Sequence, residues 1–393
     1  MDKKVIRLYL AIAFLFGLSH SFFFATYVVF LVSKGLDLLE VNLINCFFMA
    51  GVFLLEVPTG AYSDLVGRKR SFIIACFCWA LSMFIYYFSS TFWIFVIAEL
   101  IGALARAFCS GALEAWLVDS LKYYNFKGKL NDVFKKEQQL NQIGIMMGSL
   151  TGGYIGTIDL ALPWLCTSIA MALVGVFCGL VIKEEYRSKN NGSFRVKAMW
   201  KTIIESVLYG VKEKSVFYII CFSVVFSFIC QGPNMQWQIM FKNLGLDTGK
   251  LGWVFVGFCT FIFIGSQLSS WFLEITRSEK RAIVLSQLIT VIGILVASQF
   301  SILGLVISSF FIHEAGRGIF RPLKQTYINK RIPSQQRSTI LSFDSMMTMV
   351  GSVLGLVVSG WLAKNYSISA SWFFSGIVLL IAIPVFLKMK NGE

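Results

Sequence analysis

The chain has 393 residues, of which 56% are hydrophobic and only 14% are charged, and its net charge is +14. Soluble domains usually carry charge on about a quarter of their residues, so this composition indicates a membrane protein. The positive net charge fits either a nucleic-acid-binding protein or a membrane protein with Lys/Arg-rich cytoplasmic loops, and the positions of the cations decide between the two.

Apolar runs long enough to cross a bilayer, which takes roughly 20 residues, recur along the whole chain. The first run is too long for a signal peptide, and no small-residue cleavage site follows it. We therefore predict twelve membrane-spanning segments, at 8–32, 40–62, 71–90, 92–118, 138–158, 162–182, 216–240, 251–273, 282–299, 301–323, 338–362 and 368–387.

The cations are distributed very unequally between the two sides of these segments. Twelve crossings place both termini on one side, where 29 Lys and Arg residues fall, against 4 on the other side. Because cytoplasmic loops are the ones enriched in Lys and Arg, we expect a multi-pass protein of the cell membrane with both termini in the cytoplasm. Nucleic acid is then not an expected partner.

The nine cysteines all lie inside the apolar runs, and none has metal-ligand spacing with a histidine. We interpret them as small buried hydrophobic residues and predict no metal site.

The longest connection divides the chain into two halves. We predict a six-helix bundle at 1–183, a cytoplasmic linker at 184–214 and a second six-helix bundle at 215–393. Apolar residues from Trp200 to Val211 follow helical spacing and predict an amphipathic helix in the linker. This helix lies either on the inner membrane surface or against the cytoplasmic face of the protein.

The two halves resemble each other. Arg106 in the fourth segment corresponds to Arg317 in the tenth, and Asp64 after the second segment corresponds to Glu274 after the eighth. Paired six-helix repeats are a common transporter plan, with the substrate site between the halves near the membrane midplane.

The stretch 60-GAYSDLVGRKR-70 connects the second and third segments and resembles the loop motif of the major facilitator superfamily, G-x-x-x-D-x-x-G-R-[RK]. The residues that match are Gly60, Asp64, Gly67, Arg68 and Lys69. The resemblance implies an all-α fold of twelve transmembrane helices in two pseudo-symmetric bundles. The weaker copy 270-SWFLEITRSEKR-281 keeps an acid and the cations but lacks the glycines.

The same resemblance implies a gating role for this loop. Asp64 would be stabilised by the N-terminus of the eleventh helix, and Arg68 would pair with Asp119 at the end of the fourth. The alternative is that the loop only determines topology, with its cations anchoring the chain at the inner leaflet.

The fifth segment contains 144-GIMMGSLTGG-153, which resembles the antiporter motif of the superfamily, G-x-x-x-G-P-x-x-G-G. The matching glycines are Gly144, Gly148, Gly152 and Gly153, and Ser149 replaces the proline. Glycines at this spacing let helices approach closely, and ordinary small-residue packing would explain them equally.

Charged residues inside apolar runs are costly and usually functional. The candidates for proton coupling are Glu314, Glu56, Glu99, Glu114 and Asp344, with Arg106 and Arg317 as counter-ions. Glu99 and Arg106 lie nearly two turns apart and share a helix face. Alternatively, Glu314–Arg317 and Glu99–Arg106 are fixed pairs that only hold helices together. The run 313-HEAGR-317 has Arg317 where a zinc motif needs histidine, so zinc is not expected.

The expected substrate cavity contains polar residues of the seventh segment and a few residues elsewhere. Gln231, Asn234 and Gln238 share one helix face, and Gly232–Pro233 predicts a break or kink there. His313 and Tyr27 complete the candidate set. The first segment carries no acid, only His20, and 56-EVPTGAYSD-64 resembles a tetracycline- and macrolide-efflux branch.

We therefore expect proton-coupled export of a lipophilic organic compound or drug by alternating access, with the proton gradient as energy source and no cofactor. The expected partners are a small-molecule substrate, protons and membrane lipids, and we expect a monomer that is not an enzyme. Proton-coupled uptake of a small organic solute is one alternative. A non-transporting membrane receptor or scaffold is the other, which the intramembrane charges disfavour.

Overall fold

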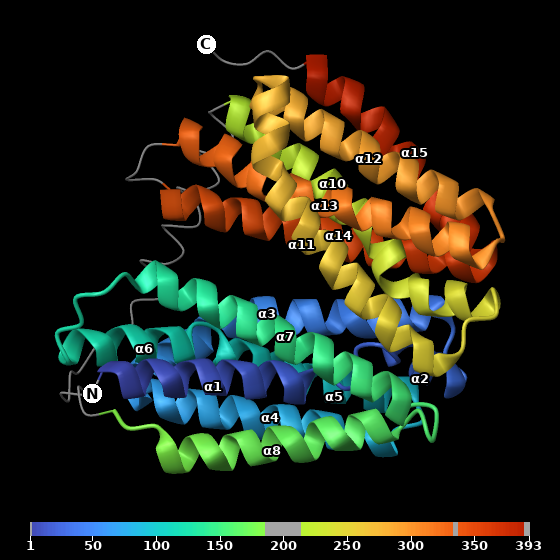
Figure 1. Cartoon of the computed structure of the whole chain (residues 1–393). Coiled ribbons are helices and arrows are strands. Elements are labelled where there is room, and N and C mark those ends of the chain that lie inside the picture. The colour runs from blue at the N-terminus through green and yellow to red at the C-terminus, as the bar shows by residue number, and fades with distance from the viewer. Residues whose placement is uncertain (1, 185–213, 333–336, 389–393) are drawn as a thin grey trace. The chain divides into compact units, whose positions relative to one another are not determined.

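The computed structural model describes residues 2–184, 214–332 and 337–388. Within them the chain is built from α-helices and one 3-10 helix (Figure 1). The elements are α1 (Asp2–His20), α2 (Tyr27–Ser33), α3 (Leu38–Val66), α4 (Arg68–Phe88), α5 (Phe92–Cys109), α6 (Ala112–Tyr123), α7 (Leu130–Ile155), α8 (Leu162–Val181), α10 (Lys214–Asn243), η1 (Thr248–Lys250), α11 (Leu251–Thr276), α12 (Glu279–Gln299), α13 (Leu303–Arg331), α14 (Arg337–Asn365) and α15 (Ile368–Lys388).

Each of the twelve predicted segments coincides with one helix or with two consecutive helical elements. The first segment is divided by a turn at residues 21–26 between α1 and α2. The fourth is divided at Ser110 and Gly111, between α5 and α6. Gly111 has φ 68°, in the left-handed region that glycine adopts without a steric penalty.

A break or kink was predicted at Gly232–Pro233, and the break does not occur, since α10 continues through both residues. A proline inside a helix removes one backbone hydrogen bond. Gly232 lies against Ser359 of α14 and Ser371 of α15, and such tertiary packing maintains the helix through the proline.

Nine described spans are long and apolar enough to cross a membrane by length and hydropathy. Helices α1, α7 and α13 are not among these nine, because polar or charged residues occupy part of each. In α13 the polar residues lie in the middle of the helix, at His313, Glu314 and Arg317. The linker predicted at 184–214 lies outside the described residues except for its two end residues, and so does its amphipathic helix.

The start of α3 is fixed by a reciprocal cap. Asp37 Oδ1 accepts hydrogen bonds from the backbone N–H groups of Leu39 and Glu40, at 2.9 Å each. Glu40 Oε2 accepts from the backbone N–H of Asp37 at 2.9 Å. Two unpaired donors of the first turn are thereby satisfied, as in a capping box.

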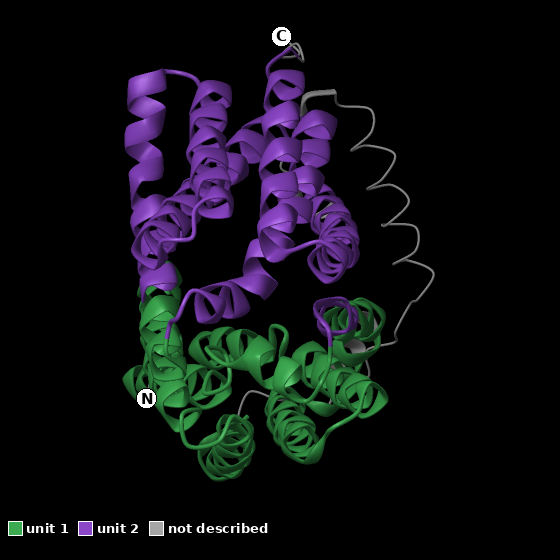
Figure 2. Cartoon of the chain, turned by 90° about the vertical axis from the view of Figure 1, so that its right-hand side faces the viewer, with its two compact units in different colours: residues 1–36, 44–194, 247–256 green, residues 37–43, 195–246, 257–393 purple. Residues whose placement is uncertain are grey.

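The helices form two compact units (Figure 2). Unit 1 contains residues 1–36, 44–194 and 247–256, and unit 2 contains residues 37–43, 195–246 and 257–393. Each unit therefore includes a short segment from the other half of the sequence.

Unit 1 is centred on two groups of helices. Helix α1 packs along α7, and α4 packs on both α5 and α8. Its largest fully buried side chains are aromatic: Tyr9, Phe30, Phe72, Tyr86, Phe95 and Trp164.

In unit 2, α12 packs on α13 and α15, and α10 packs on α14 and α15. A continuous hydrophobic cluster connects these helices. Glycines allow the closest approaches: a Cβ at Gly293 of α12 would lie 2.4 Å from the backbone nitrogen of His313. This contact brings the polar middle of α13 directly against α12.

Candidate functional site

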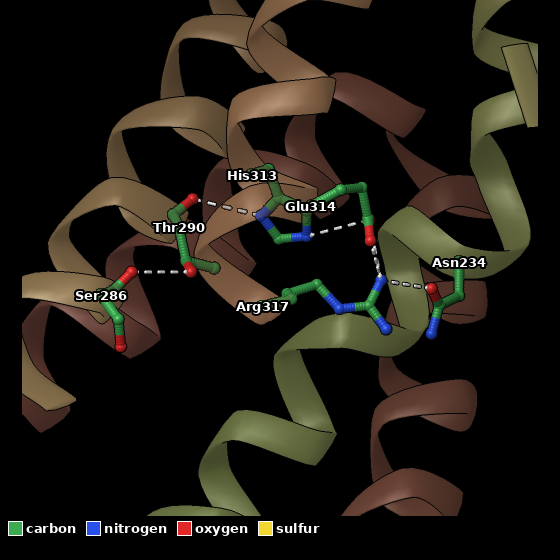
Figure 3. Close-up of polar contacts among 6 residues, drawn as sticks. All are labelled: Asn234, Ser286, Thr290, His313, Glu314 and Arg317. Carbon is green, nitrogen blue, oxygen red and sulfur yellow. Dashed lines mark hydrogen bonds and ion pairs between the residues drawn. The ribbon is translucent and has the colours of Figure 1, made fainter. Parts of the chain in front are cut away.

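Unit 2 contains a polar cluster in the middle of α13 (Figure 3). Arg317 Nη1 lies 2.8 Å from Glu314 Oε1 and 3.0 Å from Glu314 Oε2. The same nitrogen donates to Asn234 Oδ1 of α10 at 2.7 Å. The Glu314 side chain is completely buried, and the Arg317 side chain is 18% exposed. The structure thus brings together three predicted site residues from two helices.

His313 adds an imidazole to this cluster. Its Nδ1 lies 3.2 Å from the backbone oxygen of Thr290 on α12, and its Nε2 lies 3.8 Å from Glu314 Oε1. A backbone oxygen only accepts, so the hydrogen bond requires the proton on Nδ1. In the neutral ring the Nε2 lone pair then faces the carboxyl group of Glu314. Nε2 is buried and has no hydrogen-bond partner among the described residues.

This arrangement is electrically balanced as it stands. The carboxylate of Glu314 neutralises the guanidinium of Arg317. The amide oxygen of Asn234 accepts a further hydrogen bond from the same guanidinium. Arg317 keeps its charge at every physiological pH, whereas Glu314 can take up a proton. Protonation would leave a mostly buried cation without its counter-charge, which is costly unless another acceptor binds it.

A second ion pair lies in unit 2, seven residues further along α13. Lys324 Nζ is 2.8 Å from Asp344 Oδ2 of α14, and both side chains are mostly buried. The other oxygen, Oδ1, is buried and has no hydrogen-bond partner among the described residues. Sequence reasoning selected Asp344 but missed Lys324, although the spacing of seven from Arg317 places both cations on one helix face.

Unit 1 contains a different carboxylate site, at Glu99 of α5. Its Oε1 accepts hydrogen bonds from the hydroxyl groups of Tyr27 on α2, at 3.1 Å, and Tyr86 on α4, at 2.5 Å. Glu99 is 6% exposed. Sequence reasoning selected Tyr27 and missed Tyr86, because nothing in the spacing of Tyr86 relates it to α5.

The predicted Glu99–Arg106 pair is not among the described ion pairs. The Glu99 hydrogen bonds come from tyrosines, and Arg106 is exposed near the end of α5. The shared helix face did not bring the two side chains together because α2 and α4 cover Glu99. Glu56 on α3 and Glu114 on α6 are also exposed.

The remaining cavity candidates lie on α10. Gln231 Nε2 donates to the backbone oxygen of Ser227 on its own helix at 3.2 Å. Gln238 is 3% exposed. Of the three predicted α10 residues, Asn234 is the one that contacts the charged cluster of α13.

The motif stretch 60–70 is almost entirely helical rather than a loop. Gly60 and Asp64 belong to α3, and Arg68 and Lys69 open α4, with Gly67 alone between the helices at φ 113°. Arg68 Nη1 donates to Ser63 Oγ at 3.3 Å. The side chain of Asp64 lies outside the described parts of the chain. Asp119 lies on α6 and is partly buried.

The first turn of α4 contains three cations, which the helix dipole disfavours. Glu184, at the end of the first half, compensates: its Oε1 accepts the backbone N–H of Lys69 at 3.0 Å. Sequence reasoning missed this carboxylate because it is 115 residues away in sequence.

The glycines of the antiporter-like motif lie where α7 meets the backbone of other segments. Added Cβ atoms at Gly144, Gly148 and Gly152 would lie 2.5, 2.3 and 1.7 Å from backbone oxygens of Phe14, Leu18 and Phe22. Gly153 lies against Gly252. Ser149, in the proline position, donates from Oγ to the backbone oxygen of Ser21 at 3.2 Å.

A sequence model described as Major Facilitator Superfamily matches residues 9–230 and 217–392. An uncharacterized MFS-type transporter, YxaM of Bacillus subtilis (strain 168), is 24% identical over 390 residues, covering 96% of this chain and 94% of that protein. Multidrug resistance protein 1 of the same organism is 20% identical over 358 residues, covering 88% and 86%. Tetracycline resistance protein, class H, of Pasteurella multocida is 21% identical over 341 residues, covering 84% and 80%.

The fold is also found among solved structures. The crystal structure of the nucleoside transporter NupG superposes with a TM-score of 0.84 at 15% identity, covering 99% of this chain and 100% of that chain. A bacterial homolog of the human lysosomal transporter Spinster superposes with a TM-score of 0.78 at 13% identity, covering 98% and 96%.

Proposed function

The chain belongs to the major facilitator superfamily, whose members are membrane transporters and not enzymes, and we propose that it exports a lipophilic organic compound in exchange for protons. It is a multi-pass integral membrane protein that acts on a small molecule.

The Glu314–Arg317–Asn234 cluster is the observation that carries the proposal. Glu314 is fully buried and bonded to Nη1 of Arg317, and the same nitrogen also donates to Asn234. A buried carboxylate whose charge depends on one neighbour can exchange a proton when that neighbour moves. Proton binding releases Arg317 to another acceptor, and deprotonation recaptures it.

This exchange can couple proton movement to substrate movement. While Glu314 is ionised, it accepts hydrogen bonds from the Nη1 donors of Arg317. Once Glu314 is protonated, those donors are available to a polar group of the substrate or to a rearranged backbone. Substrate and proton therefore affect each other's binding through a single guanidinium, and linkage makes the effect reciprocal.

Two considerations support export. Multidrug resistance protein 1 and tetracycline resistance protein, class H, are both related to this chain over most of its length. The glycines of the antiporter-like motif also make the close contacts of α7. Uptake of a small organic solute by the same fold is the alternative, and the direction of transport distinguishes the two.

The proposed orientation places both termini in the cytoplasm, as the excess of Lys and Arg on that side supports. In this orientation Gly60, Asp64, Gly67, Arg68, Lys69 and Asp119 would form a gate at the cytoplasmic end of unit 1. We further propose that the transporter functions as a monomer.

The test uses the full chain in proteoliposomes, with a pH difference as the sole driving force and a panel of lipophilic compounds. The wild-type protein should accumulate substrate against its gradient, in the direction that corresponds to export. Glu314→Gln should abolish this accumulation while substrate binding persists with a flattened pH dependence.

Asp247→Asn is the matched control. Asp247 pairs only with Lys250 at 3.0 Å among the described ion pairs, and its side chain is 73% exposed. This variant should transport like the wild type. Accumulation by Glu314→Gln under a pH difference alone would overturn the coupling role of Glu314, and accumulation in the opposite direction would establish uptake.

A further inference from the structure

Glu99 in unit 1 is a buried carboxylate bound by hydroxyl groups instead of a cation. Tyr27 and Tyr86 both donate to the same oxygen, Oε1. Glu99 is 6% exposed. The carboxyl group is therefore buried and held in place by two hydroxyl groups at one of its oxygens.

The charged and titratable surroundings of Glu99 differ sharply from those of Glu314. The titratable groups that face Glu99 are Tyr27 from α2 and Tyr86 from α4. From α3, Gly51 approaches α5 at Ala103 and brings no charge. On α5 itself, Arg106 is exposed and forms no described bond to Glu99. An ionised carboxylate buried without a cation is costly, and two neutral hydroxyl groups offset only part of that cost.

Aromatic packing fixes the two hydroxyl groups. The Trp164 ring of α8 stacks on the Tyr86 ring with centroids 4.1 Å apart and planes 2° apart. The same indole lies 5.7 Å from the Tyr27 ring and 4.4 Å from the Phe23 ring. The tyrosine hydroxyls are thereby directed at Oε1 by rings that cannot easily rotate.

Tyr27 is the first residue of α2 and follows the turn that interrupts the first membrane segment at residues 21–26. In secondary transporters, interrupted helices lie at binding sites for substrates and coupling ions. A movement of the seven-residue α2 would remove one of the two hydrogen bonds to Glu99 without disturbing the other. The proton affinity of Glu99 thus depends on the position of a short, separate helix.

We infer that Glu99 is a second proton-binding site, so that the transporter carries two protons per substrate, one on Glu314 in unit 2 and one on Glu99 in unit 1. This inference rests on the proposed proton-coupled function. In each cycle the Glu99 carboxylate accepts a proton from water on one side of the membrane and returns it to water on the other. No other bond is formed or broken.

The proton count is measured as the limiting accumulation ratio of substrate in proteoliposomes. Potassium and valinomycin hold the membrane potential at zero, and the substrate must not change its charge over the pH range used. A pH difference of one unit then supports a ratio of about 10-fold for one proton and about 100-fold for two. We expect about 100-fold for the wild type.

Glu99→Gln should retain transport driven by the pH difference, with the limiting ratio reduced to about 10-fold. Tyr86→Phe keeps the carboxyl group and should keep the ratio near 100-fold, while the pH dependence of the transport rate shifts. Asp247→Asn, at an exposed acid of the same unit, should match the wild type in both measurements.

A wild-type ratio of about 10-fold would overturn the second proton site, and this measurement decides the matter even where Glu99→Gln fails to fold. A ratio of about 100-fold in folded Glu99→Gln would also overturn it. Both outcomes leave the proposed function intact. That function fails when the wild type shows no pH-driven accumulation, whatever ratio the Glu99 variants give.

Discussion

Arg317 and Asn234 are joined by a hydrogen bond of 2.7 Å that connects α13 to α10. The donor nitrogen, Nη1, is the one that also contacts both oxygens of Glu314. The position of the only cation bonded to Glu314 among the described residues is therefore set from the neighbouring helix as well as from its own.

Asn234→Leu keeps the volume of the side chain and removes the acceptor for Arg317. Losing a hydrogen bond to a charged group costs about 1.5–3 kcal/mol, so we expect substrate affinity to fall roughly 10- to 100-fold and the pH profile of transport to shift. Binding of a transported compound and transport rates between pH 5 and 9 measure both effects. Asn365→Leu is the control, because among the described residues its amide donates only to the backbone oxygen of Trp361 on the same helix. An unchanged pH profile in Asn234→Leu would contradict the role given to Asn234.

Gly152→Ala places a methyl group where the structure has almost no space, since a Cβ there would lie 1.7 Å from the backbone oxygen of Phe22. Forcing an atom into a packed contact costs about 1–3 kcal/mol or more, so the thermal stability in detergent should fall markedly. The matched control is Gly179→Ala in α8, where the nearest atom to an added Cβ is 3.8 Å away. That variant should be as stable as the wild type or slightly more stable, because alanine favours helix. Equal stability of the two variants would refute the close contact between α7 and residue 22.

Asp37 and Lys364 form an ion pair of 2.7 Å within unit 2. Partial burial acts to raise the pKa of Asp37, but the bond from Lys364 and the backbone N–H groups of Leu39 and Glu40 outweigh it and lower the pKa. A depressed pKa contributes stability above the ordinary aspartate range, and this contribution is lost as the pH falls through the folded-state value.

The melting temperature of Asp37→Asn should therefore lie slightly below that of the wild type between pH 5 and 8. The difference should shrink as the pH falls below about 4, the ordinary aspartate value. The effect is small because both side chains are partly exposed, and it should weaken further in high salt. A difference that grows toward acidic pH would contradict the assignment.

The proposed orientation predicts which engineered cysteines a membrane-impermeant reagent labels in intact cells. A cysteine replacing Lys34, between α2 and α3, should be labelled from outside. One replacing Lys127, between α6 and α7, should be labelled only after the membrane is opened. Labelling at position 127 in intact cells would reverse the orientation.

The positions of the membrane segments were predictable because hydrophobic length is a local property of the sequence. The interruptions between α1 and α2 and between α5 and α6 were not predictable, and a break at Pro233, one of the two outcomes predicted there, does not occur. Whether a helix continues through glycine or proline depends on its neighbours. Gly232 packs against α14 and α15, where the helix continues. Residues 21–26, where the helix is interrupted, pack instead against glycines of α7 and the residue after it, Gly156.

In the candidate site, too, contacts within one helix were predictable from the sequence and contacts between helices were not. The contact between Glu314 and Arg317 spans three residues of one helix and could be expected from helical spacing alone. The partners of Glu99 could not, because Tyr27 and Tyr86 are 72 and 13 residues away and are held by an indole from a fourth helix. Spacing within a helix instead suggested Arg106, which is exposed.

The glycine face of α7 has a mechanical consequence. Gly144, Gly148 and Gly152 meet the backbone of residues 14–22 over about 12 Å of helix. Two helices in backbone contact over that length cannot slide past each other by a turn without separating, because tightly packed surfaces do not deform continuously. We therefore expect helices α1 and α7 to move together as one rigid unit. Any bending is then expected in the segments beyond this contact, residues 23–26 and 156–161.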